Sequence, residues 1–123
     1  MKSSIYLSLL LISLFAAKSI SEYSPKVEKK FDIGLCVVEF NASFNAANRV
    51  EWIEDITGCY VNRVDISLSP SLQKKYNIVV VPTIIVLNDG EEKGRFQANI
   101  MMTMEATKGD VQGVVDEVLM SSF

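Results

Sequence analysis

Hydrophobic residues in this chain form short runs that alternate with polar, turn-forming segments. Residues 35–40 are an apolar run interrupted only by Glu39, and this run is too short for a buried helix and rich in valine. It therefore predicts an inner β-strand. After a polar stretch, apolar side chains recur at three-residue steps from Val50 to Ile56, and Gly58 follows. This spacing predicts a helix of about three turns that ends at the glycine.

The middle of the chain predicts another strand and another helix. Apolar positions over residues 60–66 indicate a second strand. Ser69 and Pro70 then supply a cap and a first-turn proline for a helix that carries Leu72 and Tyr76. Strands that alternate with helices in this way favour parallel pairing.

The most apolar segment of the chain contains a proline. Eight of the ten residues from Ile78 to Leu87 are Ile, Val or Leu, but Pro82 lies in the middle. Since proline has no N–H to donate to a sheet, we expect the strand to begin at Thr83. Turn-forming residues over 88–91 and a returning strand over 95–97 complete a predicted hairpin.

The C-terminal segment predicts a capped helix. Thr107 has Asp110 three places after it, as in a capping box, and apolar side chains then recur at helical spacing. The side chains on this face are Val111, Val114, Val115, Val118 and Leu119. The whole order of elements predicts an α/β fold, with a mixed β-sheet flanked by helices on both faces.

The N-terminus has the pattern of a secretory signal peptide. Lys2 gives a positive start, an apolar run follows, and small residues place the expected cleavage after Ser19 or Ser21. We therefore predict a signal peptide over 1–21, a single domain over 22–123, and an exported protein, either periplasmic or secreted. The alternative is a retained membrane anchor, although a run of about 13 apolar residues is shorter than the roughly 20 that span a bilayer. With cleavage, contact with the membrane is transient.

Composition excludes several classes of function. The 12 basic residues do not outnumber the 15 acidic ones and never stand more than two in a row, so nucleic-acid binding is not expected. The absence of histidine excludes Ser-His-Asp and Cys-His catalysis and histidine zinc sites. Met101, Met102 and Met104 carry thioethers that suit Cu(I), but such methionines more often serve as adaptable packing or as a contact surface, and Phe96 and Ile100 beside them favour packing. We expect no cofactor and no metal.

The chain has two cysteines, Cys36 and Cys59, with 22 residues between them. An exported protein meets an oxidising environment, where such a pair can close a disulfide worth roughly 3 kcal/mol if its geometry permits. The sequence leaves this possible disulfide open.

Residues 38–48 resemble the active-site strand and loop of the thioredoxin family. In that family an acid, a phenylalanine and further aromatic and small residues lead into Cys-x-x-Cys, whereas here Asn45 and Asn48 hold both cysteine places. The equivalent loop contains Phe44, Asn45, Ala46, Ala47 and Asn48. The resemblance covers residues 35–119 and implies a thioredoxin-like fold.

Further positions fit the same resemblance. Val81, Pro82 and Thr83 are similar to the family's cis-proline loop, which presents backbone groups to an extended peptide. The resemblance thus implies a cis bond before Pro82 and a peptide-binding role for these three residues. Glu39 and Arg63 fall where the family places a buried acid and its basic partner, and we expect a structural buried ion pair.

The two asparagines decide the expected function. Thiol-disulfide exchange requires an attacking thiolate and a resolving thiol, and a carboxamide supplies neither. Asn45 and Asn48 serve either as caps and loop residues or as part of a peptide groove. We predict a non-catalytic module that binds a protein or peptide client. The alternative is a thiol-disulfide oxidoreductase or redox sensor that uses Cys36 and Cys59. The client's identity and the oligomeric state stay open.

Overall fold

The computed structural model describes residues 31–123, of which Asp32–Phe123 form one compact unit. The predicted signal peptide over 1–21 lies outside the described residues. The elements are β1 (Leu35–Asn41), the 3₁₀ helices η1 (Ser43–Asn48) and η2 (Glu51–Asp55), β2 (Tyr60–Asp65), α2 (Pro70–Lys75), β3 (Thr83–Asn88), β4 (Glu91–Gln97) and α3 (Lys108–Ser121). No helix in the described part is long and apolar enough to cross a membrane.

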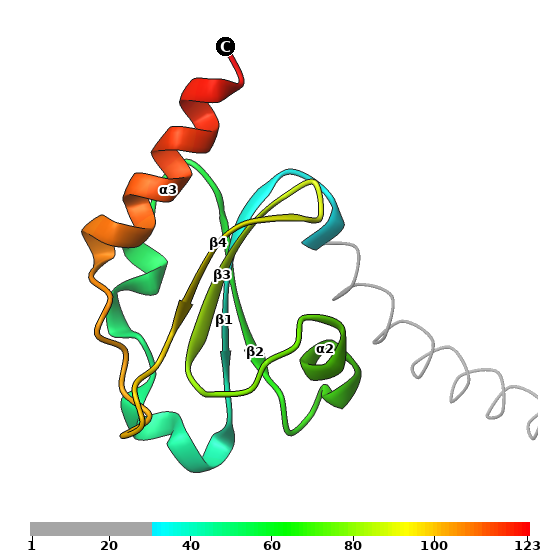
Figure 1. Ribbon diagram of the computed structural model, residues 1–123, viewed down its shortest axis with the longest axis vertical. Helices are drawn as coiled ribbons and strands as arrows, with labels where there is room; N and C mark the ends of the chain where they lie inside the picture. The colour runs from blue at the N-terminus through cyan, green and yellow to red at the C-terminus, as the bar shows by residue number, and fades with distance from the viewer. Residues whose placement is uncertain (1–30) are drawn as a thin grey trace, which may run out of the picture. The chain divides into compact units, whose positions relative to one another are not determined.

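Four strands form one mixed sheet in the order β2-β1-β3-β4 (Figure 1). β1 runs parallel to β2 and antiparallel to β3, and β3 and β4 form the predicted hairpin. The central strands β1 and β3 are almost completely buried, whereas β2 and β4 at the edges are partly exposed. The predicted mixed sheet is confirmed.

Helices cover both faces of this sheet, as predicted. On one face, the ring of Tyr76 at the end of α2 lies 5.4 Å from the ring of Phe40 in β1. On the other face, α3 and η2 pack on the sheet (Figure 1). The buried residues of that second layer are Val37, Val50, Ile53, Ile56, Ile84, Val86, Val111 and Val115.

Three elements begin where the sequence predicted. α3 begins after a complete capping box, in which the Thr107 side chain accepts from the Asp110 N–H and the Asp110 carboxylate accepts from the Thr107 N–H. α2 has Pro70 in its first turn and Ser69 at its N-cap position, but the Ser69 side chain makes no capping bond. β3 begins at Thr83, directly after Pro82.

The predicted three-turn helix before Gly58 is wrong, because the structure has only the five-residue η2 there. Arg49, with ψ of 150°, breaks the helical path between η1 and η2. The N–H of Val50 then donates to a buried carboxylate oxygen of Glu39 at 2.6 Å instead of to a helical carbonyl. The three-residue spacing from Val50 to Ile56 still marks buried positions, and a long-range bond determines the backbone between them.

Candidate functional site

The loop that follows β1 contains the two asparagines. Residues Ser43–Asn48 form η1, in which the Phe44 side chain is 75% exposed while Asn45 is only 4% exposed. The residue that precedes η1, Ala42, makes no side-chain capping bond. The next helix, η2, has Val50 at its N-cap without a side-chain capping bond, so neither asparagine caps it, and their amides have other partners within the loop.

The amide of Asn45 joins three separate segments. Its Nδ2 lies 3.2 Å from Asn41 Oδ1, 3.4 Å from the Val81 carbonyl and 3.1 Å from the Met102 carbonyl, and its Oδ1 accepts from Asn48 Nδ2 at 2.9 Å. A primary amide has two N–H groups, so three acceptors share two protons. Asn45 thus ties η1 to the end of β1, to the segment before β3 and to the segment after β4.

The predicted peptide-binding residues lie inside the domain. The Val81–Pro82 bond is cis, Val81 is 6% exposed, and Pro82 and Thr83 are buried. The Val81 carbonyl faces Asn45, and the Pro82 carbonyl accepts from the Ala98 N–H at 3.0 Å. The three residues therefore contact the loop from inside the domain and expose little surface to a client.

The segment after β4, residues 98–104, is a compact turn that we call the methionine loop. The Oδ1 of Asn99 accepts from the N–H of Met101 at 2.9 Å and from the N–H of Thr103 at 3.1 Å. The Asn99 N–H donates to the Thr103 carbonyl at 3.0 Å, and Met102 has a φ of 59°. These bonds hold the turn in one shape.

The methionine loop presents apolar side chains to solvent. Ile100 is 97% exposed and Met101 is 71% exposed, so the expectation that Ile100 packs in the interior is wrong, although Phe96 does pack on the core. Figure 1 shows this loop and η1 at the same end of the domain, opposite the C-terminal end of α3. We call the apolar side chains that these two segments expose, those of Phe44, Ile100, Met101 and Met102, the apolar end.

The expected partners Glu39 and Arg63 are in contact beneath η1. Arg63 Nη1 donates to Glu39 Oε1, and the other donors of Arg63 reach Glu54 at 3.1 Å and the Val50 carbonyl at 2.9 Å. The Glu39 side chain is 2% exposed and its second oxygen binds the Val50 N–H. Both carboxylate oxygens are therefore engaged, and Glu39 works as a structural acceptor.

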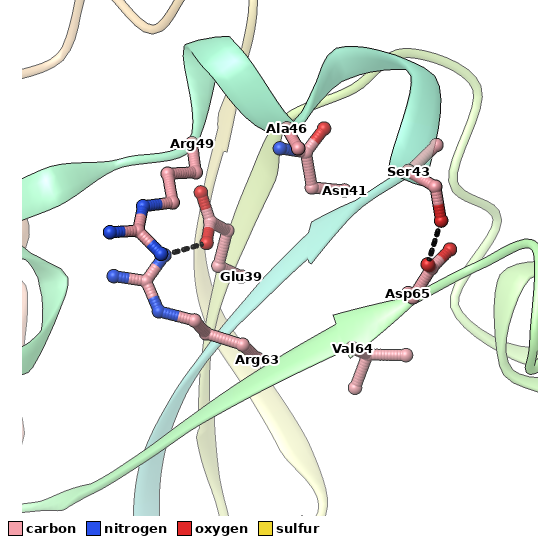
Figure 2. A pocket seen from close by; sticks show the side chains of 9 residues that line it. Glu39, Asn41, Ser43, Ala46, Arg49, Arg63, Val64 and Asp65 are labelled. Atoms are coloured by element: carbon pink, nitrogen blue, oxygen red, sulfur yellow. Dashed lines mark hydrogen bonds and ion pairs between the residues drawn. The ribbon is translucent and has the colours of Figure 1, made fainter.

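A pocket of about 380 Å³ opens beside this ion pair (Figure 2). Arg49, Arg63 and Glu39 lie on one side of it, and Ser43 and Asp65 lie on the other. Hydrogen bonds from the Ser43 hydroxyl and from the Ser67 backbone lower the pKa of the Asp65 carboxyl. The pocket therefore combines fixed charges of both signs.

The two cysteines are free thiols on opposite faces of the sheet. Cys59 packs on the core layer that contains Val37, and Cys36 precedes Val37 in β1, so strand alternation directs Cys36 to the other face. Burial raises the pKa of Cys36 to about 11, with further contributions from Cys59 and Asp32, and burial also raises the pKa of Cys59. Neither thiol is an activated nucleophile at neutral pH.

We expect mass spectrometry after alkylation of the folded protein to find two free thiols, with Cys59 labelled faster than the fully buried Cys36. The raised pKa values keep both groups protonated at neutral pH, and labelling should accelerate as the pH rises toward 11. Reversible closure of an intramolecular disulfide near about −200 mV, where catalytic pairs work, would contradict this arrangement.

Comparison with solved structures identifies the fold. No protein-family model matches the chain, and no curated protein matches it. Thioredoxin from Schistosoma mansoni matches 75% of this chain and 86% of its own at 20% identity, with a TM-score of 0.58. Thioredoxin 1 from Thermosipho africanus matches 71% and 97% at 21% identity, with a TM-score of 0.54. Fasciola hepatica thioredoxin matches 75% and 88% at 23% identity, with a TM-score of 0.53. The described domain therefore has the thioredoxin fold.

Sequence reasoning missed the bonds that organise the site. Asn45 contacts residues 36 and 57 places away in the chain, and no local pattern indicates these contacts. Asn99 carried a detectable signal, because asparagine commonly organises turns through its own side chain.

Proposed function

Starting from the thioredoxin fold, we propose that this chain is a non-catalytic binding protein in which Asn45 and Asn48 stand in place of the two active-site cysteines of thioredoxins. Its client is a protein or peptide, which it holds without exchanging disulfides. The predicted signal peptide over 1–21 adds export to this proposal, and the N-terminal sequence of the mature protein tests it.

The absence of disulfide exchange is supported by the two asparagines and by the placement of the two cysteines. Neither asparagine can attack a disulfide, and the amide of Asn45 is committed to internal bonds. Cys36 and Cys59 lie on opposite faces of the sheet with raised pKa values. This placement and the raised pKa values count against the alternative that the two thiols form a catalytic pair, although Cys59 lies close enough to contribute to the raised pKa of Cys36.

Binding is supported by one observation above all: the segments that Asn45 joins expose apolar side chains in a preformed arrangement. Phe44, Ile100 and Met101 are each at least 71% exposed, and Asn99 fixes the turn that carries the last two. Contiguous apolar groups that remain exposed on a folded protein mark a contact surface. Methionine also adapts to clients of different shape.

The proposal is tested with a client that has no disulfide chemistry. We expect the protein to bind a permanently unfolded, carboxymethylated protein, and to bind it equally well after Cys36→Ala with Cys59→Ala. Phe44→Ser should weaken binding severalfold, because it removes an aromatic contact at the apolar end. Met120→Ser is the matched control, since Met120 is 74% exposed on α3 at the other end of the domain.

Isothermal calorimetry gives the affinities in this experiment. Binding that disappears in the double alanine variant would return the function to the thiols. Equal losses from Phe44→Ser and Met120→Ser would show that the apolar end is not the contact surface.

A further inference from the structure

One asparagine of the chain has the sequence context of a glycan acceptor. Asn41, Ala42 and Ser43 form an Asn-x-Ser triplet whose middle residue is not proline. In exported proteins this triplet marks an asparagine to which an oligosaccharide is attached, normally at the surface. None of the other asparagines in the sequence has serine or threonine two positions later. Asn41 is therefore the single candidate acceptor.

The structure leaves the Asn41 side chain accessible to solvent. Asn41 is the last residue of β1 and is partly exposed. Its side chain lines the pocket of about 380 Å³ that also contains Arg49 and Asp65 (Figure 2). Ser43, the third residue of the triplet, is exposed in η1, where its hydroxyl donates to Asp65. A sugar attached to Asn41 can therefore leave the domain through the pocket without entering the core.

The hydrogen bonds of Asn41 are compatible with an attached sugar. Asn41 Nδ2 donates to the Asn45 carbonyl at 3.3 Å, and Asn41 Oδ1 accepts from Asn45 Nδ2 at 3.2 Å. A primary amide has two N–H groups, and attachment of a sugar replaces only one of them. The substituted amide keeps one N–H and its carbonyl oxygen, which are the two groups that these contacts require. The bonds that join Asn41 to η1 therefore do not depend on an unmodified side chain.

We propose that Asn41 is an N-glycosylation site. Asn41 Nδ2 attacks the anomeric carbon of an oligosaccharide carried on a lipid diphosphate, and the new carbon–nitrogen bond replaces the carbon–oxygen bond to the diphosphate. One Nδ2 proton passes to a base of the membrane-bound transferase, and the lipid diphosphate is the leaving group. This inference rests on the export that the proposed function includes, because the triplet is modified only in chains that cross a membrane.

Cell-free synthesis of the full chain with endoplasmic-reticulum microsomes tests the proposal. We expect part of the product to be protected from added protease and to carry one glycan, which endoglycosidase H removes. Asn41→Gln and Ser43→Ala should each abolish the glycosylated band, because each breaks the triplet. Ser43→Thr is the matched control, since it keeps a hydroxyl at the third position and should keep the glycan.

Unfolding of the glycosylated protein provides a second measurement. The full chain is secreted from eukaryotic cells that keep high-mannose glycans, and endoglycosidase H trims part of the sample to a single sugar. We expect both samples to have the same midpoint of urea unfolding, followed by the fluorescence of Trp52. The reason is that the modified Asn41 keeps its contacts with Asn45. A glycosylated protein that does not fold would overturn the proposal.

Each other outcome has a defined meaning. A chain that enters the microsomes without acquiring a glycan overturns the site and leaves export intact. A chain that stays outside the microsomes overturns export and the site together. A glycan that persists in Asn41→Gln overturns the assignment to this residue. Binding of the carboxymethylated client is measured with unmodified protein, so its result does not depend on any of these outcomes.

Discussion

Replacing Asn45 and Asn48 together by cysteine is expected to create disulfide-reducing activity at least about a hundredfold above that of the unsubstituted protein. The two side chains already meet, since Asn48 Nδ2 lies 2.9 Å from Asn45 Oδ1. A cysteine sulfur lies one bond closer to the backbone than these atoms, so closure of a disulfide requires Cβ atoms about 3.5–4.5 Å apart. A nucleophilic and a resolving thiol three residues apart complete the chemistry that the asparagines lack.

The structure also predicts a limit on this new activity. A thiol at position 45 lies where the present side chain is 4% exposed and faces the methionine loop. We therefore expect a small aromatic disulfide to react faster than a folded protein disulfide. Losing the Asn45 bonds should also cost about 1–3 kcal/mol of stability, because the Val81 and Met102 carbonyls lose a donor.

Controls separate chemistry from a change in shape. Asn45→Ser with Asn48→Ser keeps small polar side chains and should show no turnover. Asn48→Cys alone should form mixed disulfides without completing a cycle, since no second thiol resolves them. The assays are the reduction of a small aromatic disulfide, followed by absorbance, and the reduction of insulin by dithiothreitol, followed by turbidity. A folded double-cysteine variant that closes its disulfide and still shows no turnover would refute the equivalence of this loop with the thioredoxin active site.

Elements with a complete local signal were predictable from the sequence. The capping box formed by Thr107 and Asp110 marks the beginning of α3. Pro82 marks the beginning of β3 at Thr83. Both signals are local, because a capping bond joins residues three positions apart and a proline lacks an N–H at its own position.

Features that depend on distant partners were not predictable from local pattern. η2 is short because the Val50 N–H finds the Glu39 carboxylate, and Asn45 is buried because two distant carbonyls accept from its amide. The exposure of Ile100 has the same origin, since Asn99 folds the loop outward. In each case the hydrogen bonds of one polar side chain determine the local structure, and the pattern of neighbouring apolar residues does not reveal these bonds.

Glu39→Ala is expected to destabilise the domain by at least about 1–3 kcal/mol, the cost of leaving a buried donor without its acceptor. The change leaves the guanidinium of Arg63 and the N–H of Val50 without the carboxylate that now binds both. Since a domain of this size has about 5–15 kcal/mol of stability, the variant loses a large share of it. The single tryptophan, Trp52, packs on the core and reports urea unfolding by fluorescence.

Glu54→Ala provides a matched control because Glu54 pairs with the same arginine from the surface. Its side chain is 72% exposed, so its removal should cost less than about 1 kcal/mol. Glu39→Gln should fall between the two alanine variants, because it retains an acceptor for the Val50 N–H while losing the charge. If Glu39→Ala and Glu54→Ala cost the same, the carboxylate beneath η1 is not the group that shapes this end of the domain. A large difference would show that the buried carboxylate of Glu39 stabilises the domain through its hydrogen bonds to Val50 and Arg63.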